Sequence, residues 1–178
     1  MKKFFLPILL VVVSLVAYNL GRTLGVTKNN ATADQQNIDE TSQLDGHHTK
    51  DLVMHCMDFR FQGMEHRFTC DTCGRKADKL SWPGAVKILN SDNPALKEEA
   101  LDAIKTAIEK HGIEIIHLIN HLDCGGYGGS TKHADTGAEK QFHADELTRA
   151  GNTIHERFKT LVVRKYIASR QGIEELAP

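Results

Sequence analysis

The chain of 178 residues is long enough for one globular domain with a hydrophobic core, and a second full domain would need a longer chain. It carries 22 basic and 23 acidic residues, so it lacks the positive excess with which proteins bind nucleic acid. We therefore exclude nucleic acid as a partner.

The N-terminal segment, residues 1–22, predicts export from the cytoplasm. Lys2 and Lys3 precede an almost unbroken apolar run over residues 4–17. A signal peptide and a membrane anchor both stay open, because the run resembles a signal-peptide core and is shorter than the roughly 20 residues that span a bilayer. Either alternative delivers the rest of the chain outside the cytoplasm, secreted, periplasmic or anchored, with membrane contact only through this segment.

The next stretch, residues 23–50, is polar and free of aromatic residues, as in a flexible linker. The folded domain is expected over residues 51–178. Its first strand is predicted around the apolar residues 52–54, and a second strand around the apolar residues 85–89.

A helix is predicted from Pro94 to the residue before Gly112, with Asp92 or Asn93 as its N-cap. Three further elements follow in order, a buried strand over 113–119, a helix over 139–157 and a strand over 161–167. This alternation predicts an α/β domain with a mostly parallel β-sheet flanked by helices.

Candidate chemistry begins where the first strand ends. Cys56, Asp58 and Arg60 alternate, and that spacing in extended chain directs all three side chains to the same side. Arg60 can hold Asp58 ionised through a paired charge-assisted hydrogen bond. On its own this triplet is more typical of a surface ion pair beside a buried cysteine.

A second group follows the most continuous apolar strand. His121 and Cys124 are three residues apart in a glycine-rich turn, and ligand sites of open α/β sheets form beyond the carboxyl ends of strands. With Cys56 from the neighbouring strand they would complete a Cys2His set, which leaves a tetrahedral zinc ion one open position for water. The alternative is a turn with a core cysteine and a capping histidine, since cysteine is often buried as a small apolar residue.

The two motifs Cys56-Met57-Asp58-Phe59-Arg60 and His121-Leu122-Asp123-Cys124-Gly125 together resemble the signature of the β-class carbonic anhydrases. The resemblance covers residues 52–172. It implies Zn²⁺ held by Cys56, His121 and Cys124, with Asp58 as hydrogen-bond acceptor and Arg60 as its partner. It also implies a homodimer with active sites near the subunit interface, and a zinc-bound hydroxide that attacks carbon dioxide to give bicarbonate.

Cys70 and Cys73 form a Cys-x-x-Cys pair outside that signature. A disulfide, half of a second metal site with His66, and a redox pair all stay open. The predicted function is reversible hydration of carbon dioxide. The alternatives are a hydrolase of carbonyl sulfide or carbon disulfide, and a non-catalytic zinc-binding or redox protein on the same fold.

Overall fold

The computed structural model describes residues 46–74 and 76–177. The predicted signal or anchor segment, residues 1–22, and most of the predicted linker, residues 23–50, lie outside this part of the chain. Among the described residues, no helix combines the length and the apolar character needed to cross a membrane.

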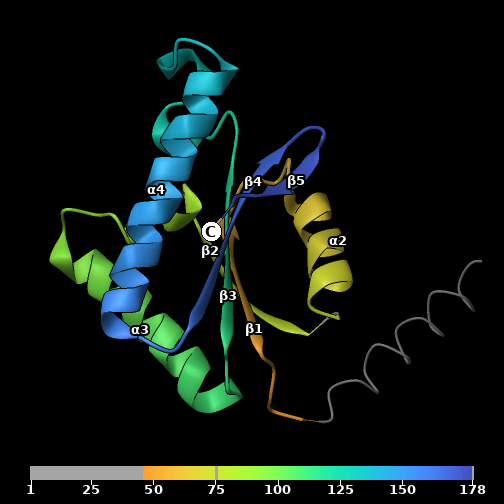
Figure 1. Cartoon of the computed structure of the whole chain (residues 1–178), viewed down its shortest axis with the longest axis vertical. Coiled ribbons are helices and arrows are strands. Elements are labelled where there is room, and N and C mark those ends of the chain that lie inside the picture. The colour runs from red at the N-terminus through yellow and green to blue at the C-terminus, as the bar shows by residue number, and fades with distance from the viewer. Residues whose placement is uncertain (1–45, 75, 178) are drawn as a thin grey trace, which may run out of the picture. The chain divides into compact units, whose positions relative to one another are not determined.

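A five-stranded sheet with the strand order β2-β1-β3-β4-β5 forms the centre of the domain (Figure 1). The first four strands pair in parallel with one another, and β5 runs antiparallel to β4. The strands are β1 Asp51–Cys56, β2 Ala77–Trp82, β3 Ile115–His121, β4 Val162–Ser169 and β5 Gly172–Glu175. The predicted α/β class with a mostly parallel sheet flanked by helices is confirmed.

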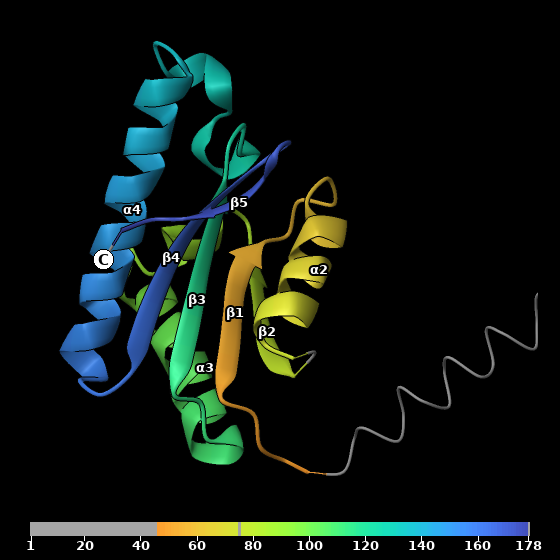
Figure 2. The same cartoon turned by 45° about the vertical axis from the view of Figure 1, so that its right-hand side comes forward.

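Helices cover both faces of the sheet, as Figures 1 and 2 show. The helices are α2 Gln62–Thr72, α3 Pro94–His111 and α4 Thr136–Arg157. Along β1, the even-numbered Leu52 and Met54 belong to the larger core with α3 and α4, whereas Val53 belongs to a smaller core with the α2 residues Met64 and Phe68. This alternation follows from the two-residue period of a strand.

The helix α3 is confirmed with both of its predicted ends. The Asn93 side chain accepts a hydrogen bond of 3.0 Å from the Ala95 N–H, which settles the N-cap in favour of Asn93, and Pro94 occupies the first turn. Gly112 ends the helix with a φ of 78°, a left-handed conformation that suits glycine.

The predicted second strand was wrong in position. Residues Ala85–Ile88 form a short 3₁₀ helix, η1, because the chain turns at Gly84 and Ala85 with φ values of 76° and 48°. The apolar side chains of η1 pack in the hydrophobic core, although η1 is not part of the sheet. The actual strand, β2, lies at the sheet edge and is only partly buried, so its sequence has no continuous apolar run.

The sequence also gave no sign of α2 and β5. The α2 segment has few apolar residues, and only Met64 and Phe68 of them pack on the sheet. The β5 segment has four residues and completes a hairpin with β4, which is too short for a clear periodic pattern.

Candidate metal centre

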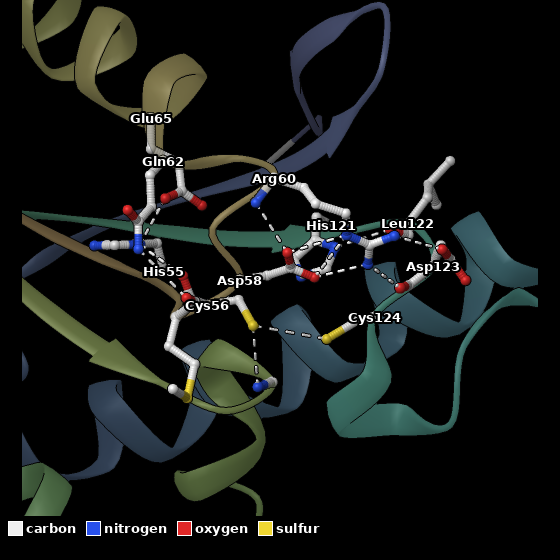
Figure 3. A network of polar contacts seen from close by, with 12 residues as sticks. His55, Cys56, Asp58, Arg60, Gln62, Glu65, His121, Leu122, Asp123 and Cys124 are labelled. Atoms are coloured by element: carbon white, nitrogen blue, oxygen red, sulfur yellow. Dashed lines mark hydrogen bonds and ion pairs between the residues drawn. The ribbon is translucent and has the colours of Figure 1, made fainter.

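The three candidate ligands lie at the carboxyl ends of two neighbouring parallel strands (Figure 3). Cys56 is the last residue of β1, His121 is the last residue of β3, and Cys124 follows in the turn. Their donor atoms all lie within 4.8 Å of one another, and all three residues are buried. The structure therefore brings together the residues that the sequence motifs singled out.

His121 presents one ring nitrogen to the two sulfurs. Its Nδ1 lies 2.8 Å from the Leu122 carbonyl oxygen, and a hydrogen bond donated there leaves the lone pair on Nε2. Nε2 is buried and has no hydrogen-bond partner among the described residues. The ring stacks on Phe61 at a centroid distance of 4.3 Å, which fixes its orientation. Such an imidazole is prepared to bind a metal ion.

The sulfur geometry fits zinc. Two thiolates bound to a tetrahedral zinc ion at about 2.3 Å each would lie about 3.8 Å apart. Cys56 Sγ and Cys124 Sγ are 3.9 Å apart. With the free Nε2 of His121 they form a Cys2His set, which is typical of zinc sites that keep one coordination position open.

Hydrogen bonding between the two cysteines favours a single thiolate in the pair. A hydrogen bond with Cys124 lowers the pKa of Cys56 well below its usual range, with further help from His121 and the Gly84 amide against the effect of burial. The Gly84 N–H lies 3.4 Å from Cys56 Sγ. The same pairing, together with burial, raises the pKa of Cys124. A divalent cation would replace the remaining proton, because both cysteines then bind as thiolates.

Asp58 and Arg60 make the predicted pair beside this cluster. Arg60 donates to both carboxylate oxygens of Asp58, from Nε at 3.0 and 3.1 Å and from Nη2 at 2.7 Å. This hydrogen bonding lowers the pKa of Asp58 to about 2. Asp58 Oδ2 lies 3.8 Å from His121 Nε2, so the carboxylate reaches the donor atoms. Asp58 and Arg60 thus lie beside the cluster as expected, but the cause is different, because β1 ends at Cys56 and the chain turns through residues 58–61.

Sequence reasoning missed two acidic residues that fix the second motif. Asp123 accepts a hydrogen bond of 2.7 Å from Arg60 Nη1, so one guanidinium joins the loops after β1 and β3. The buried Glu139 of α4 accepts 2.7 Å hydrogen bonds from the Asp123 N–H and the Ser130 hydroxyl. A signal for Asp123 was its place inside the second motif, whereas nothing in the sequence pointed to Glu139.

A cavity of about 760 Å³ adjoins the arginine. Its lining includes Arg60, Phe61, Asp123 and Arg170, but none of the three candidate ligands. The cavity therefore opens toward the ion pair of Arg60 and Asp123 and not directly toward the sulfurs.

The other cysteines and histidines lie apart from this cluster. All four cysteines are free thiols, so the disulfide alternative for Cys70 and Cys73 is not observed. His55 points to the α2 side as strand alternation requires, and its Nδ1 lies 2.7 Å from the buried Glu65 carboxylate (Figure 3). His117 shares the sheet face of His121 but lies beside Asp51 and Tyr166.

The chain is similar to proteins of a known family. Residues 46–176 match a family model described as putative carbonic anhydrase. An uncharacterized protein of Rickettsia conorii is 29% identical over 142 residues, which are 70% of this chain and 69% of that protein.

Solved structures show the same fold. The β-carbonic anhydrase CcaA aligns with a TM-score of 0.56 at 14% identity, over 91% of this chain and 92% of CcaA. A carbonic anhydrase from Glaciozyma antarctica aligns with a TM-score of 0.53 at 13% identity, over 84% of this chain and 97% of its own.

Proposed function

We propose that this chain, which belongs to the putative carbonic anhydrase family, interconverts carbon dioxide and bicarbonate with a zinc ion held by Cys56, His121 and Cys124. One observation carries the proposal. The Nε2 atom of His121 is buried without a hydrogen-bond partner among the described residues, and it faces two sulfurs spaced as zinc requires. A buried nitrogen left unpaired costs free energy that a bound metal would recover.

Zinc bound there would lower the pKa of a coordinated water and so supply a nucleophile near neutral pH. Asp58 is placed to orient that water, because its carboxylate stays ionised and lies next to the donor cluster. An ionised carboxylate accepts hydrogen bonds only, so it holds an attacking oxygen by its hydrogen and leaves an oxygen lone pair free for the substrate carbon.

Arg60 is a positioning residue in this proposal. Its guanidinium uses Nε and Nη2 on Asp58 and Nη1 on Asp123. The Asp58 carboxylate therefore cannot rotate without breaking a paired hydrogen bond, and the loops after β1 and β3 keep their spacing. Preorganisation of this kind lets the acceptor act without rearrangement during the reaction.

We propose a homodimer as the working form. Met57 and Phe59, on either side of Asp58, are 57% and 81% exposed. Large apolar side chains next to a candidate active site are typical of a surface that another subunit covers. Export of the chain, with residues 1–22 either as a signal peptide or as a membrane anchor, remains a prediction from the sequence, which fractionation of cells producing the full chain would test.

The test combines metal analysis with stopped-flow hydration of carbon dioxide. Asp58→Asn should keep the zinc and lower kcat/KM by at least about 10²-fold, the usual loss when an acid-base group is removed. Cys70→Ser is the matched control and should retain full activity, because Cys70 lies outside the cluster.

Two results would contradict the proposal. A zinc-loaded protein without carbon dioxide turnover would favour the non-catalytic alternative. Turnover of carbonyl sulfide or carbon disulfide in place of carbon dioxide would assign the same site to the hydrolase alternative.

A further inference from the structure

The Cys70-x-x-Cys73 pair does not act as one unit in the structure. Cys70 lies in α2, with its sulfur 3.7 Å from His66 Nε2. Cys73 follows the end of α2 and is buried in the smaller core between this helix and the sheet. The two thiols therefore have different neighbours, and Cys73 faces residues of β1 and β3.

Asp51, Cys73 and His117 form a second cluster of donor atoms. One donor atom from each lies within 4.8 Å of the other two. Val53 pairs with His117 across β1 and β3, so Asp51, two residues earlier, projects to the same sheet face. His117 Nε2 lies 2.8 Å from Asp51 Oδ1.

We propose that Asp51, Cys73 and His117 hold a second divalent cation of the zinc class. A thiolate, an imidazole and a carboxylate are all zinc ligands, whereas Ca²⁺ and Mg²⁺ prefer oxygen ligands alone. The donors come from β1, β3 and the segment after α2, three parts of the chain that a bound ion would join.

The surroundings of His117 are those of an oriented metal ligand. Its second ring nitrogen, Nδ1, lies 3.2 Å from the Tyr166 hydroxyl, and outer partners of this kind fix the orientation of ligating imidazoles. Phe68 and Tyr166 pack against the ring at centroid distances of 5.6 and 5.7 Å. The Asp51 side chain is 18% exposed, which gives an incoming cation contact with solvent.

The second site is separate from the first. Asp51 begins β1 and Cys56 ends it, so five residues of extended chain, about 16 Å, lie between them. The cluster lies far from Asp58 and Arg60, so we assign it a structural role. A bound ion would fasten the end of α2 to the sheet and stabilise the folded state by mass action.

The experiment measures metal content and the absorption of the cobalt-substituted protein. Wild-type protein at saturating zinc should bind one equivalent more than Cys73→Ser, whereas Cys70→Ser should match the wild type. The double variant Cys56→Ser/Cys124→Ser removes both sulfurs of the first site. In this double variant, thiolate-to-cobalt charge transfer should persist, because Cys73 still binds the metal. The band should disappear when Cys73→Ser is added, and it should remain when Cys70→Ser is added.

Wild-type protein that saturates at a single equivalent of zinc would overturn the inference, and this measurement needs no variant to fold. Loss of all cobalt charge transfer in Cys56→Ser/Cys124→Ser would do the same. Asp51→Asn keeps every cysteine and changes only one side-chain atom, and it should weaken binding of the second equivalent while the first equivalent stays bound.

Discussion

Gly126 packs directly on Gly84, so closely that a Cβ built on Gly126 would lie 2.7 Å from the Gly84 nitrogen. That nitrogen donates its hydrogen to Cys56 Sγ. The turn after Cys124 and the loop before η1 thus fit together only because Gly126 lacks a side chain.

Gly126→Ala should therefore lower zinc affinity. The added methyl group has to displace the Gly84 backbone, which moves a hydrogen-bond donor away from Cys56 and shifts the turn that carries Cys124. The measurement is competition for zinc against a chelator. Gly125→Ala is the matched control, because a Cβ there meets nothing within 4 Å, and equal zinc affinities in the two variants would contradict the argument.

Arg60→Lys should lower kcat/KM for carbon dioxide while zinc stays bound. A lysine ammonium cannot keep the paired hydrogen bonds to Asp58 and also reach Asp123, so the acceptor loses its fixed position. Misplacement of a catalytic group can cost on the order of 10²-fold in rate. Arg164→Lys, at an exposed position on β4, is the control, and a loss of the same size there would show that the effect is not specific to Arg60.

The buried His143 should make the folded state less stable in acid. Burial lowers its pKa to about 4, although Glu139, 3.9 Å away, raises it. The unfolded chain, with a histidine pKa of about 6.5, binds the proton more readily, so stability is full above pH 6.5 and falls as the pH drops toward 4. Between pH 7 and pH 5 this group should cost on the order of 2 kcal/mol.

The check for His143 is denaturant unfolding of the wild type and of His143→Gln at several pH values. The variant should lose less stability than the wild type between pH 7 and pH 5. His66→Gln, at an exposed position of α2, controls for loss of an imidazole as such. Parallel pH profiles for the wild type and His143→Gln would show that His143 is not responsible.

Asn93→Ala should lower the free energy of unfolding by about 1 kcal/mol, the usual cost of losing an N-cap side chain. The lost interaction is the hydrogen bond from the Ala95 N–H. Asp92→Ala tests the neighbouring residue, which the sequence left open as the cap and which accepts no cap hydrogen bond in α3. Denaturant melts should separate the two variants, and a larger loss for Asp92→Ala would reverse the assignment.

Local signals explain which parts of the fold could be predicted. α3 has a capping residue, a proline in its first turn and a glycine at its end, so its bounds could be read from the sequence. β2 could not be located, because an edge strand is half exposed and the nearby apolar run of η1 resembled a strand more closely. Tertiary packing therefore determined which of the two segments, η1 or β2, became the strand.

The sequence could predict those residues of the candidate site that lie at the ends of strands. Cys56 and His121 close β1 and β3, and the sequence placed both correctly because the runs before them were apolar. The role of Glu139 could not be predicted, since its contact with the Asp123 amide depends on how α4 packs against the rest of the domain. The sequence also could not predict that Cys70 and Cys73 have different environments, because this depends on where α2 ends.

The pairing of β1 with β3 has a consequence for the order of assembly. Cys56 and His121 come from opposite sides of the pleat, since Met54 faces α3 and α4 while Ile119 faces α2, and their donors converge only beyond the strand ends. A slip of one residue between the strands would reverse the face of one donor and shift one strand end past the other, so the donors would no longer meet in this arrangement. Metal uptake should therefore come late, after the chain has found its native alignment, and a loaded centre would report that folding had been completed without error.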